Sequence, residues 1–270
     1  MRNSKSDTWL VNECNIIEPT FIALRHEQIN TQTEYKSHAH VFGQLLYVVC
    51  GIMEMEVEGK HYLAPPEFCI WIPANTQHAS FSKQSVKFRI IDFSQKYNDK
   101  FAQRACVVKL SAIFHSIMTD MFLRGVSLPE TEQDTRLAEV LIDQFAVLPC
   151  QDTYLPTTKD RFLAPILQEL QKEPADNTTL AEWAKRYYTS ERTLSRRCQQ
   201  ELGMSFSEWR QRLRYLHAVA ALEKGKSVYE VALDVGYSSA SAFIAMFQQI
   251  SGVTPDRFRL KEFIVQGNLE

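Results

Sequence analysis

The sequence predicts an α+β protein with a β-rich N-terminal half, two helices after it, and an all-α C-terminal domain. Three observations support this prediction. A helical pattern occurs twice after residue 180, apolar residues alternate with period two between residues 20 and 95, and apolar residues recur at three- and four-residue steps between residues 109 and 148. With 270 residues, the chain is long enough for two domains that each bury a core of their own.

The C-terminal pattern consists of two similar copies. Residues 180–184 (LAEWA) correspond to residues 228–232 (VYEVA), and residues 194–200 (LSRRCQQ) correspond to residues 243–249 (FIAMFQQ). Each copy has a short helix, a tight break and a second helix, which is the arrangement of a helix-turn-helix. Ser190 and Ser239 stand where the second helices begin, and a serine at an N-cap accepts a hydrogen bond from a free backbone N–H of the first turn. We therefore predict that both second helices start at these serines.

The tight break differs between the copies. The second copy has Gly236, which adopts the left-handed backbone of a tight turn without a Cβ clash, whereas the first copy has Tyr188 at that place. This difference implies either a strained turn in the first copy or a slightly different turn, and both alternatives stay open at this stage.

The second helix of the first copy is expected to have a buried face and an exposed face. Leu194 and Cys198 lie four residues apart and should face the core. The residues on the opposite side are types that read DNA, because arginine binds the guanine edge through two hydrogen bonds and serine approaches donors or acceptors. An ordinary solvated face is the alternative for one such helix, but the duplication favours DNA binding. The predicted residues are Arg192, Ser195, Arg196 and Gln199.

A linker helix is predicted over residues 207–222, where apolar residues recur at helical spacing. Sixteen residues at about 1.5 Å each span about 24 Å, which suits two recognition helices placed about one DNA turn, about 34 Å, apart. The arginines on this helix suit phosphate contacts better than base reading. They are Arg210, Arg212 and Arg214.

The C-terminal domain resembles that of the AraC-type transcription regulators, in which a long helix joins two helix-turn-helix units. The resemblance covers residues 161–262 and rests on residues 236–239 (GYSS), on Phe243 and Phe247, and on residues 252–259 (GVTPDRFR). It implies that Arg192, Ser195 and Arg196 contact bases. In the second unit it implies the same for Ala240, Ser241, Ile244 and Ala245.

The second set of implied contacts is chemically weak. Alanine and isoleucine form no hydrogen bonds and at most touch a thymine methyl group. We therefore expect the first unit to read the sequence and the second unit to position the protein on the DNA backbone. Ser238 and Ser241 complete the predicted DNA-binding set.

Charge and composition fit a DNA-binding protein when they are examined locally. The net charge is only −2, but residues 185–214 carry eight cations against three acidic residues, as a folded binding face requires. The start of the chain has no signal-peptide core and no apolar run approaches the length of a membrane span, so we expect a soluble cytoplasmic protein with no membrane partner. The six cysteines are scattered, which favours small buried side chains over zinc binding or redox sensing.

The N-terminal half is predicted to form a small antiparallel β-barrel or sandwich. Period-two stretches occur at residues 44–49, 53–58, 68–72 and 87–93, and residues 58–60 form a candidate hairpin turn. Residues 38–51 and 73–78 (PANTQH) resemble the two motifs of the cupins, which are His-x-His followed by a glutamate and a glycine, and Pro-x-Gly-x-x-His. Here Gln44 stands for the glutamate and Asn75 for the glycine.

The cupin resemblance implies a ligand-binding site in the barrel. Residues two apart on a strand share a face, so His38, His40 and Gln44 should lie on one surface, with His78 approaching from another strand. Three neutral imidazoles can hold a divalent ion, but the missing carboxylate removes charge compensation. A polar pocket for a small molecule and a structural remnant are the competing interpretations, and no cofactor is identified. The predicted ligand-binding residues are His38, His40, Gln44, Trp71 and His78, with a place in the core as the alternative for Trp71.

Helical stripes over residues 109–125 and 134–148 predict two helices that either cap the barrel or pair with another subunit. The resemblance to AraC-type proteins favours a homodimer formed through them. The predicted domains are a cupin-like sensor at 1–105, a helical dimerisation segment at 106–150, a linker at 151–160 and the tandem helix-turn-helix domain at 161–270.

Together these features predict a sequence-specific transcription regulator that binds double-stranded DNA, responds to a small-molecule effector, and is not an enzyme. Two alternatives stay open. One is a constitutive regulator with an inactive barrel, whose DNA affinity no metabolite would change. The other is a cupin-type metal enzyme tethered to DNA, against which the absent glutamate speaks.

Overall fold

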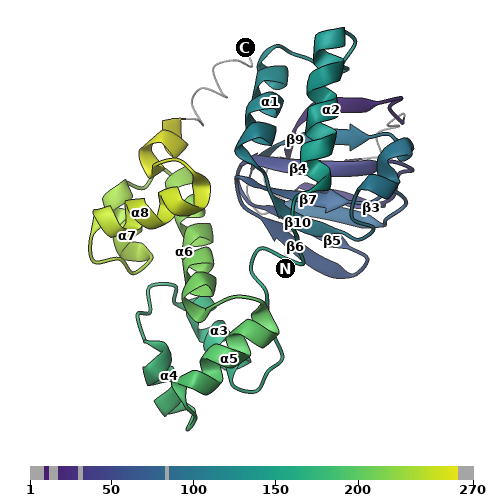
Figure 1. Cartoon of the computed structure of the whole chain (residues 1–270). Coiled ribbons are helices and arrows are strands. Elements are labelled where there is room, and N and C mark those ends of the chain that lie inside the picture. Colours follow the sequence, from purple (N-terminus) through teal and green to yellow (C-terminus); the bar gives the residue numbers. More distant parts are fainter. Residues whose placement is uncertain (1–8, 12–17, 30–32, 83–84, 261–270) are drawn as a thin grey trace, which may run out of the picture. The chain divides into compact units, whose positions relative to one another are not determined.

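A computed structural model describes residues 9–11, 18–29, 33–82 and 85–260. The chain divides into two compact units, Met1–Tyr154 and Leu155–Glu270. This division falls inside the segment 151–160 that the sequence predicts as a linker. Figure 1 shows the helices and strands of each unit.

The strands of the first unit form two sheets rather than one closed barrel. The five-stranded sheet has the order β1-β3-β8-β5-β6, and the six-stranded sheet has the order β11-β10-β7-β4-β9-β2. All described pairs are antiparallel except β1 with β3, and the two sheets adjoin where β6 contacts β7 and β10. The strands are β1 (Trp9–Val11), β2 (Ile22–Ile29), β3 (Thr33–His38), β4 (Gly43–Cys50), β5 (Met53–Val57), β6 (Lys60–Ala64), β7 (Phe68–Ile72), β8 (His78–Ser82), β9 (Val86–Phe93), β10 (Cys106–Lys109) and β11 (Cys150–Gln151).

The strands predicted at residues 44–49, 53–58, 68–72 and 87–93 correspond to β4, β5, β7 and β9, which confirms the predicted antiparallel pattern. The predicted turn between β5 and β6 is also present, with Glu58 and Gly59 at φ angles of 50° and 74°. Two consecutive positive φ values suit the right-handed twist of a two-residue hairpin.

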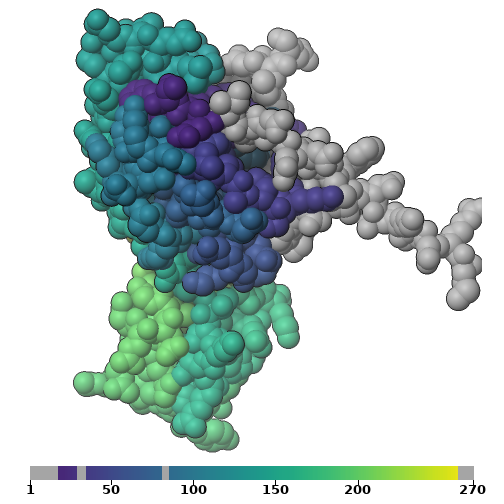
Figure 2. Space-filling view, turned by 90° about the vertical axis from the view of Figure 1, so that its right-hand side faces the viewer, coloured from purple at the N-terminus to yellow at the C-terminus, as the bar shows by residue number. Residues whose placement is uncertain are grey.

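Two helices, α1 (Ala112–Leu123) and α2 (Glu132–Ala146), cover one face of the six-stranded sheet. Their buried residues, including Phe114, Met118 and Phe145, share one apolar cluster with Leu45 and Trp71 of the sheet. In the space-filling view, teal atoms at one end of the first unit border blue and purple atoms of the same unit (Figure 2). The helices thus cap the sheet, as one of the two alternatives from the sequence expected. The short helix η1 (Gln95–Lys100) precedes β10.

A disulfide joins Cys106 of β10 to Cys150 of β11 and closes the segment that contains α1 and α2. This finding corrects the expectation that the cysteines serve only as small buried side chains. The two residues lie 44 positions apart in the sequence and show no paired motif, so only the pairing of β10 with β11 brings them together. Cys14 lies outside the described residues.

The second unit is all-helical, as predicted. It contains α3 (Leu163–Lys172), α4 (Leu180–Arg186), α5 (Glu191–Leu202), α6 (Phe206–Glu223), α7 (Val228–Asp234) and α8 (Ala240–Ser251). Helix α6 confirms the linker helix predicted over residues 207–222 and connects the α4–α5 pair to the α7–α8 pair (Figure 1). None of the helices in the described ranges combines the length and apolar character that a membrane crossing requires.

The helix starts of the two copies are built alike. Ser190 and Ser239 are the N-caps of α5 and α8, and each side chain accepts a hydrogen bond from the backbone N–H three residues later, which confirms the prediction. The first helices also match, because Thr179 and Ser227 each form a reciprocal capping box with a glutamate three residues on. The repeat in the sequence is therefore a repeat of local structure.

Candidate nucleic-acid interface and histidine site

The α4–α5 and α7–α8 pairs have the same tight turn. Tyr188 has a φ angle of 51° and Gly236 one of 82°, so both are left-handed. The backbone bonds also correspond: Tyr188 N–H donates to Lys185 O in the first pair, and Gly236 N–H donates to Leu233 O in the second. The first of the two alternatives left open by the sequence is thus correct, because the first copy keeps the turn with a non-glycine residue in a conformation that L side chains seldom adopt.

Helix α5 presents the polar face that the sequence predicts. Leu194, Cys198 and Leu202 are buried, and they attach the helix to a core built around Trp183 and Trp209. The opposite side is exposed to solvent. It carries Arg192, Ser195, Arg196 and Gln199, all of them exposed.

Helix α8 has the same orientation of faces and a different chemistry. Phe243 and Phe247 are buried and their rings contact each other, and the Phe247 ring also contacts the rings of Tyr215 and Phe258. The positions equivalent to those of the α5 face hold Ser241, Ile244, Ala245 and Gln248. Three of these are exposed and Ile244 is half-buried, and Ser238 in the turn before α8 is exposed as well. The α8 face therefore offers one hydroxyl and one amide, whereas the α5 face offers two guanidinium groups, one hydroxyl and one amide.

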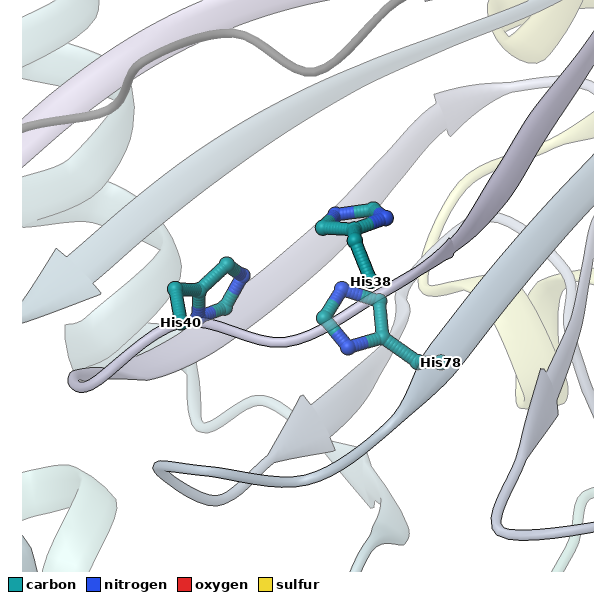
Figure 3. A group of neighbouring side chains, drawn as sticks. All are labelled: His38, His40 and His78. Carbon is teal, nitrogen blue, oxygen red and sulfur yellow. The ribbon is translucent and has the colours of Figure 1, made fainter.

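The predicted ligand-binding histidines lie together in the first unit. His38 ends β3 and pairs in register with His78, which begins β8, while His40 lies in the segment that follows β3 (Figure 3). Their ligand nitrogens all lie within 4.8 Å of one another. The sequence reached this grouping by strand alternation, but β3 ends at His38, so His40 comes close through the connecting segment instead.

Burial favours the neutral form of His40 and His78. It lowers the pKa of His78 to about 3, although the hydrogen bond to Thr76 O acts in the opposite direction. Burial likewise lowers the pKa of His40, whose ring stacks on Phe42 with centroids 4.4 Å apart. A buried imidazole that stays neutral keeps one nitrogen lone pair available.

The glycine missing from the second cupin motif is replaced without loss of the turn. Asn75 has a φ angle of 60°, and asparagine tolerates this left-handed conformation better than most residues. Its N–H donates to His40 O at 2.7 Å, so the turn before His78 holds the segment that carries His40. Asn75 thus performs the backbone role of the glycine in this position.

Gln44, which stands for the glutamate of the motif, is bound to a carboxylate. It is buried on β4, and its side-chain Nε2 donates to Asp92 Oδ1 at 2.8 Å. Asp92 is fully buried and also accepts from Arg25 Nε at 2.8 Å. Gln44 therefore belongs to a buried polar network with Arg25 and Asp92 on the face of the sheet that turns away from α1 and α2.

Comparison with known proteins agrees with this architecture. Residues 183–261 match the model of a family described as a helix-turn-helix domain. The HTH-type transcriptional regulator NimR of Escherichia coli is 29% identical over 221 residues, which cover 82% of this chain and 81% of that protein. The regulator RipA of Corynebacterium glutamicum is 36% identical over 103 residues, 38% of this chain and 31% of that protein.

The chain is a DNA-binding transcription regulator whose C-terminal helix-turn-helix domain is of the AraC type. Among solved structures, ToxT from Vibrio cholerae is similar over 90% of this regulator and 99% of that chain, with 12% identity and a TM-score of 0.38. The C-terminal domain of AraT from Geobacillus stearothermophilus is similar over 37% of this regulator and 84% of that chain, with 29% identity and a TM-score of 0.36. The helix-turn-helix match and the relatives named as transcriptional regulators show that the regulator binds DNA to control transcription.

Two predicted site residues of the regulator occupy other roles. Trp71 is 1% exposed, packs against Phe93, Phe101 and Phe145, and donates its Nε1 hydrogen to Ala102 O. It pairs in register with Leu45, the neighbour of Gln44, and the pleat turns neighbouring residues to opposite faces. Trp71 therefore lies in the core beneath α1 and α2, away from the histidines, and the ligand-binding role predicted for it is corrected.

Arg214 is the second correction. It is 5% exposed, and its guanidinium donates to Pro174 O, Asp176 O and Asn177 Oδ1, each at 3.0 Å. Three of the five guanidinium N–H groups are thus committed inside the unit, and the buried side chain is poorly placed to reach a phosphate, so we remove Arg214 from the predicted DNA contacts. The other two linker arginines are partly engaged: Arg210 donates to Thr178 O, and Arg212 pairs with Glu208 one turn earlier.

Two further candidate residues for DNA binding were not predicted from the sequence. Gln248 is exposed at the α8 position equivalent to Gln199, and the repeat alignment could have named it. Tyr188 is 97% exposed in the turn before α5, so the aromatic ring stands free beside the predicted DNA-reading helix. No sequence signal announces this exposure, because an aromatic residue in a helical segment is usually buried.

The two turn residues predict different responses to alanine. A Cβ at Gly236 would lie 2.5 Å from Ala175 O and 2.8 Å from Arg214 Nη2, in addition to the left-handed backbone. We expect Gly236→Ala to lower the free energy of unfolding by about 2 kcal/mol or more, because both backbone strain and a collision with backbone atoms arise. Tyr188→Ala, at the equivalent exposed position, should change it by less than about 0.5 kcal/mol. Urea unfolding of both variants measures this difference, and equal losses would contradict it.

Proposed function

We propose that the regulator reads its operator mainly with α5 and uses α8 to position the protein on the DNA. The observation that carries this proposal is the contrast between the two exposed faces. Helix α5 offers Arg192 and Arg196, whose guanidinium groups can each form two hydrogen bonds with a guanine, whereas α8 offers Ser241 and Ala245 at the same positions. The remaining members of the proposed interface are Ser195, Gln199, Arg210, Arg212, Ser238 and Gln248.

Arg196→Ala should weaken binding to the operator by about 1–3 kcal/mol while leaving binding to random DNA nearly unchanged. The matched control is Ala245→Ser, which alters the equivalent position of α8 and should change operator preference little. Titrations of both variants at one fixed salt concentration measure the effects, since phosphate contacts make affinity depend on salt. Equal losses on operator and random DNA would identify Arg196 as a phosphate contact, and a loss of discrimination in Ala245→Ser would contradict the proposed inequality of the units.

We also propose that the regulator acts as a homodimer through α1 and α2. The proposal is supported by large apolar side chains that remain exposed on and beside these helices although the helices already cover a sheet. Such side chains are typical of a surface that another chain covers. They are Ile113, Leu123, Leu128, Val140 and Val147. Sedimentation velocity of the purified regulator tests whether it has the mass of a dimer.

A small-molecule effector bound in the first unit is proposed to change DNA binding. Support comes from the polar groups grouped inside that unit, the three histidines and the network of Gln44, Asp92 and Arg25. Polar groups in a protein interior cost about 1–3 kcal/mol each when unpaired, so such a grouping requires partners. The relatives are named as transcription regulators, which favours a binding role over catalysis for this unit.

The double substitution His40→Ala and His78→Ala should abolish the response of the promoter in cells, while the purified variant still binds operator DNA. An effector must bind one state of the regulator better than another, since equal affinities shift no equilibrium. His61→Ala, an exposed histidine of β6, is the matched control and should respond normally. A double variant with normal regulation would exclude the sensing role and would favour constitutive DNA binding with an inactive first unit.

A further inference from the structure

The three clustered histidines share one orientation. In each ring, Nδ1 lies within hydrogen-bond distance of a backbone carbonyl two residues away: His38 with Lys36 O at 2.8 Å, His40 with Phe42 O at 3.0 Å, and His78 with Thr76 O at 2.9 Å. A carbonyl oxygen only accepts, so Nδ1 must carry the proton in all three rings. In the neutral tautomer that these bonds select, the lone pair lies on Nε2, the nitrogen left for a ligand.

The free nitrogens meet in one place. The ring centroids lie 4.3 Å apart for His38 and His78, 4.9 Å for His40 and His78, and 5.8 Å for His38 and His40. Figure 3 shows the three rings gathered around one point. His40 Nε2 is buried and has no hydrogen-bond partner, which leaves an acceptor unsatisfied at this point. Three imidazole nitrogens without protons cannot donate to one another, and an electron-pair acceptor placed between them would satisfy all three lone pairs at once.

We propose that His38, His40 and His78 bind one divalent transition-metal ion through their Nε2 atoms, with zinc as the ion whose chemistry they fit best. A tetrahedral zinc ion with Zn–N distances of about 2.0–2.1 Å needs its ligand nitrogens about 3.3 Å apart, which small ring rotations reach from the observed 4.8 Å limit. Carbonyl bonds to the outer nitrogen are the usual support of a metal-binding histidine, since they fix the tautomer and the ring direction. Imidazole ligands suit zinc, copper, iron and nickel, whereas magnesium and calcium prefer oxygen ligands.

The surrounding residues brace this site without joining it. Asn75 N–H donates to His40 O, and Ser37 Oγ donates to Gln77 Oε1 at 3.0 Å, so both histidine-bearing segments are held together beside the rings. Gln44 is bound to Asp92 and does not supply a fourth ligand. Three protein ligands leave a coordination position for water or for a donor atom of an effector. Metal binding by the three histidines does not depend on the proposed effector response. Only a role of the metal in regulation rests on that proposed function.

Cobalt binding tests the site on the full-length regulator, prepared free of tags and stripped of metal with a chelator. Titration with Co²⁺ should give visible d–d absorption of a low-coordinate site that saturates at one ion per chain, and Zn²⁺ should displace it. His38→Ala, His40→Ala and His78→Ala should each weaken Co²⁺ binding by about tenfold or more, because each removes one of three ligands. His61→Ala should bind as the wild type does.

Each outcome of this experiment decides the proposal. Absence of cobalt uptake by the wild type overturns it, as does wild-type affinity in folded His38→Ala and His40→Ala variants. Circular dichroism checks that each variant is folded. If the variant of buried His78 does not fold, the variant of half-exposed His38 still tests the site. Because uptake is measured without DNA, a regulator that binds cobalt and shows no effector response in cells keeps the metal site and loses only the proposed sensing role.

Discussion

Replacing Trp71 with alanine is expected to lower the free energy of unfolding of the N-terminal unit by about 3–5 kcal/mol. The indole is almost completely buried, contacts three phenylalanine rings, and lies against Gly43, where an added Cβ would come within 2.2 Å of the ring. Removing it leaves a cavity beneath α1 and α2 and leaves Ala102 O without its donor. Both effects act on the folded state, so the loss should appear without any ligand.

Urea unfolding followed by hydrogen-exchange mass spectrometry measures this loss separately for each unit. Val147→Ala is the matched control, since Val147 is 76% exposed and its truncation should change stability by less than about 0.5 kcal/mol. A loss below about 1 kcal/mol in Trp71→Ala would show that the indole is not a core residue. It would return Trp71 to the ligand-binding role that the sequence suggested.

Arg214→Met should lower the free energy of unfolding of the C-terminal unit by about 3 kcal/mol. The guanidinium satisfies two backbone carbonyls and one side-chain carbonyl in the segment between α3 and α4, and hydrogen bonds from a charged donor contribute about 1.5–3 kcal/mol each. Removing a buried cation recovers part of its desolvation cost, and methionine keeps the apolar stem, so the net loss stays below the sum of the bonds.

The comparison variant for Arg214→Met is Arg192→Met, at the exposed end of α5. The two substitutions should have opposite signatures. Arg192→Met should leave unfolding unchanged within about 0.5 kcal/mol and weaken operator binding, whereas Arg214→Met should weaken DNA binding only as far as it unfolds the domain. If folded Arg214→Met, measured well below its melting temperature, lost affinity with a reduced salt dependence, a phosphate contact would be restored for this residue.

The helical domain was predictable because its signals are local. Apolar spacing placed α5, α6 and α8, and serine caps placed the starts of α5 and α8. The arginines were not predictable to the same degree. Arg192 and Arg214 look alike in the sequence, and only the position of the 174–177 segment shows that one faces backbone carbonyls and the other faces solvent.

The sequence motif predicted the histidine site, but strand alternation alone does not form it. The motif named His38, His40 and His78, and the structure brings them together. Of His38 and His40, only His38 lies on strand β3, so strand alternation does not explain the position of His40. Gln44 and Trp71 were assigned to the same site because the sequence does not reveal which face of β4 and β7 turns toward the helices. Register fixes that choice, and register depends on pairing between distant segments.

The tie between Arg214 and the segment before α4 has a consequence for promoters. That segment also meets the turn between α7 and α8, where Asn177 donates to Gly236 O, so α6 and both helix pairs are joined on one side. The distance between α5 and α8 is then fixed by the protein rather than by the DNA. One inserted base pair would shift a sub-site by about 3.4 Å and turn it by about 34° around the duplex. Operators of this regulator should therefore differ in base sequence but keep a constant number of base pairs between the sub-sites of α5 and α8.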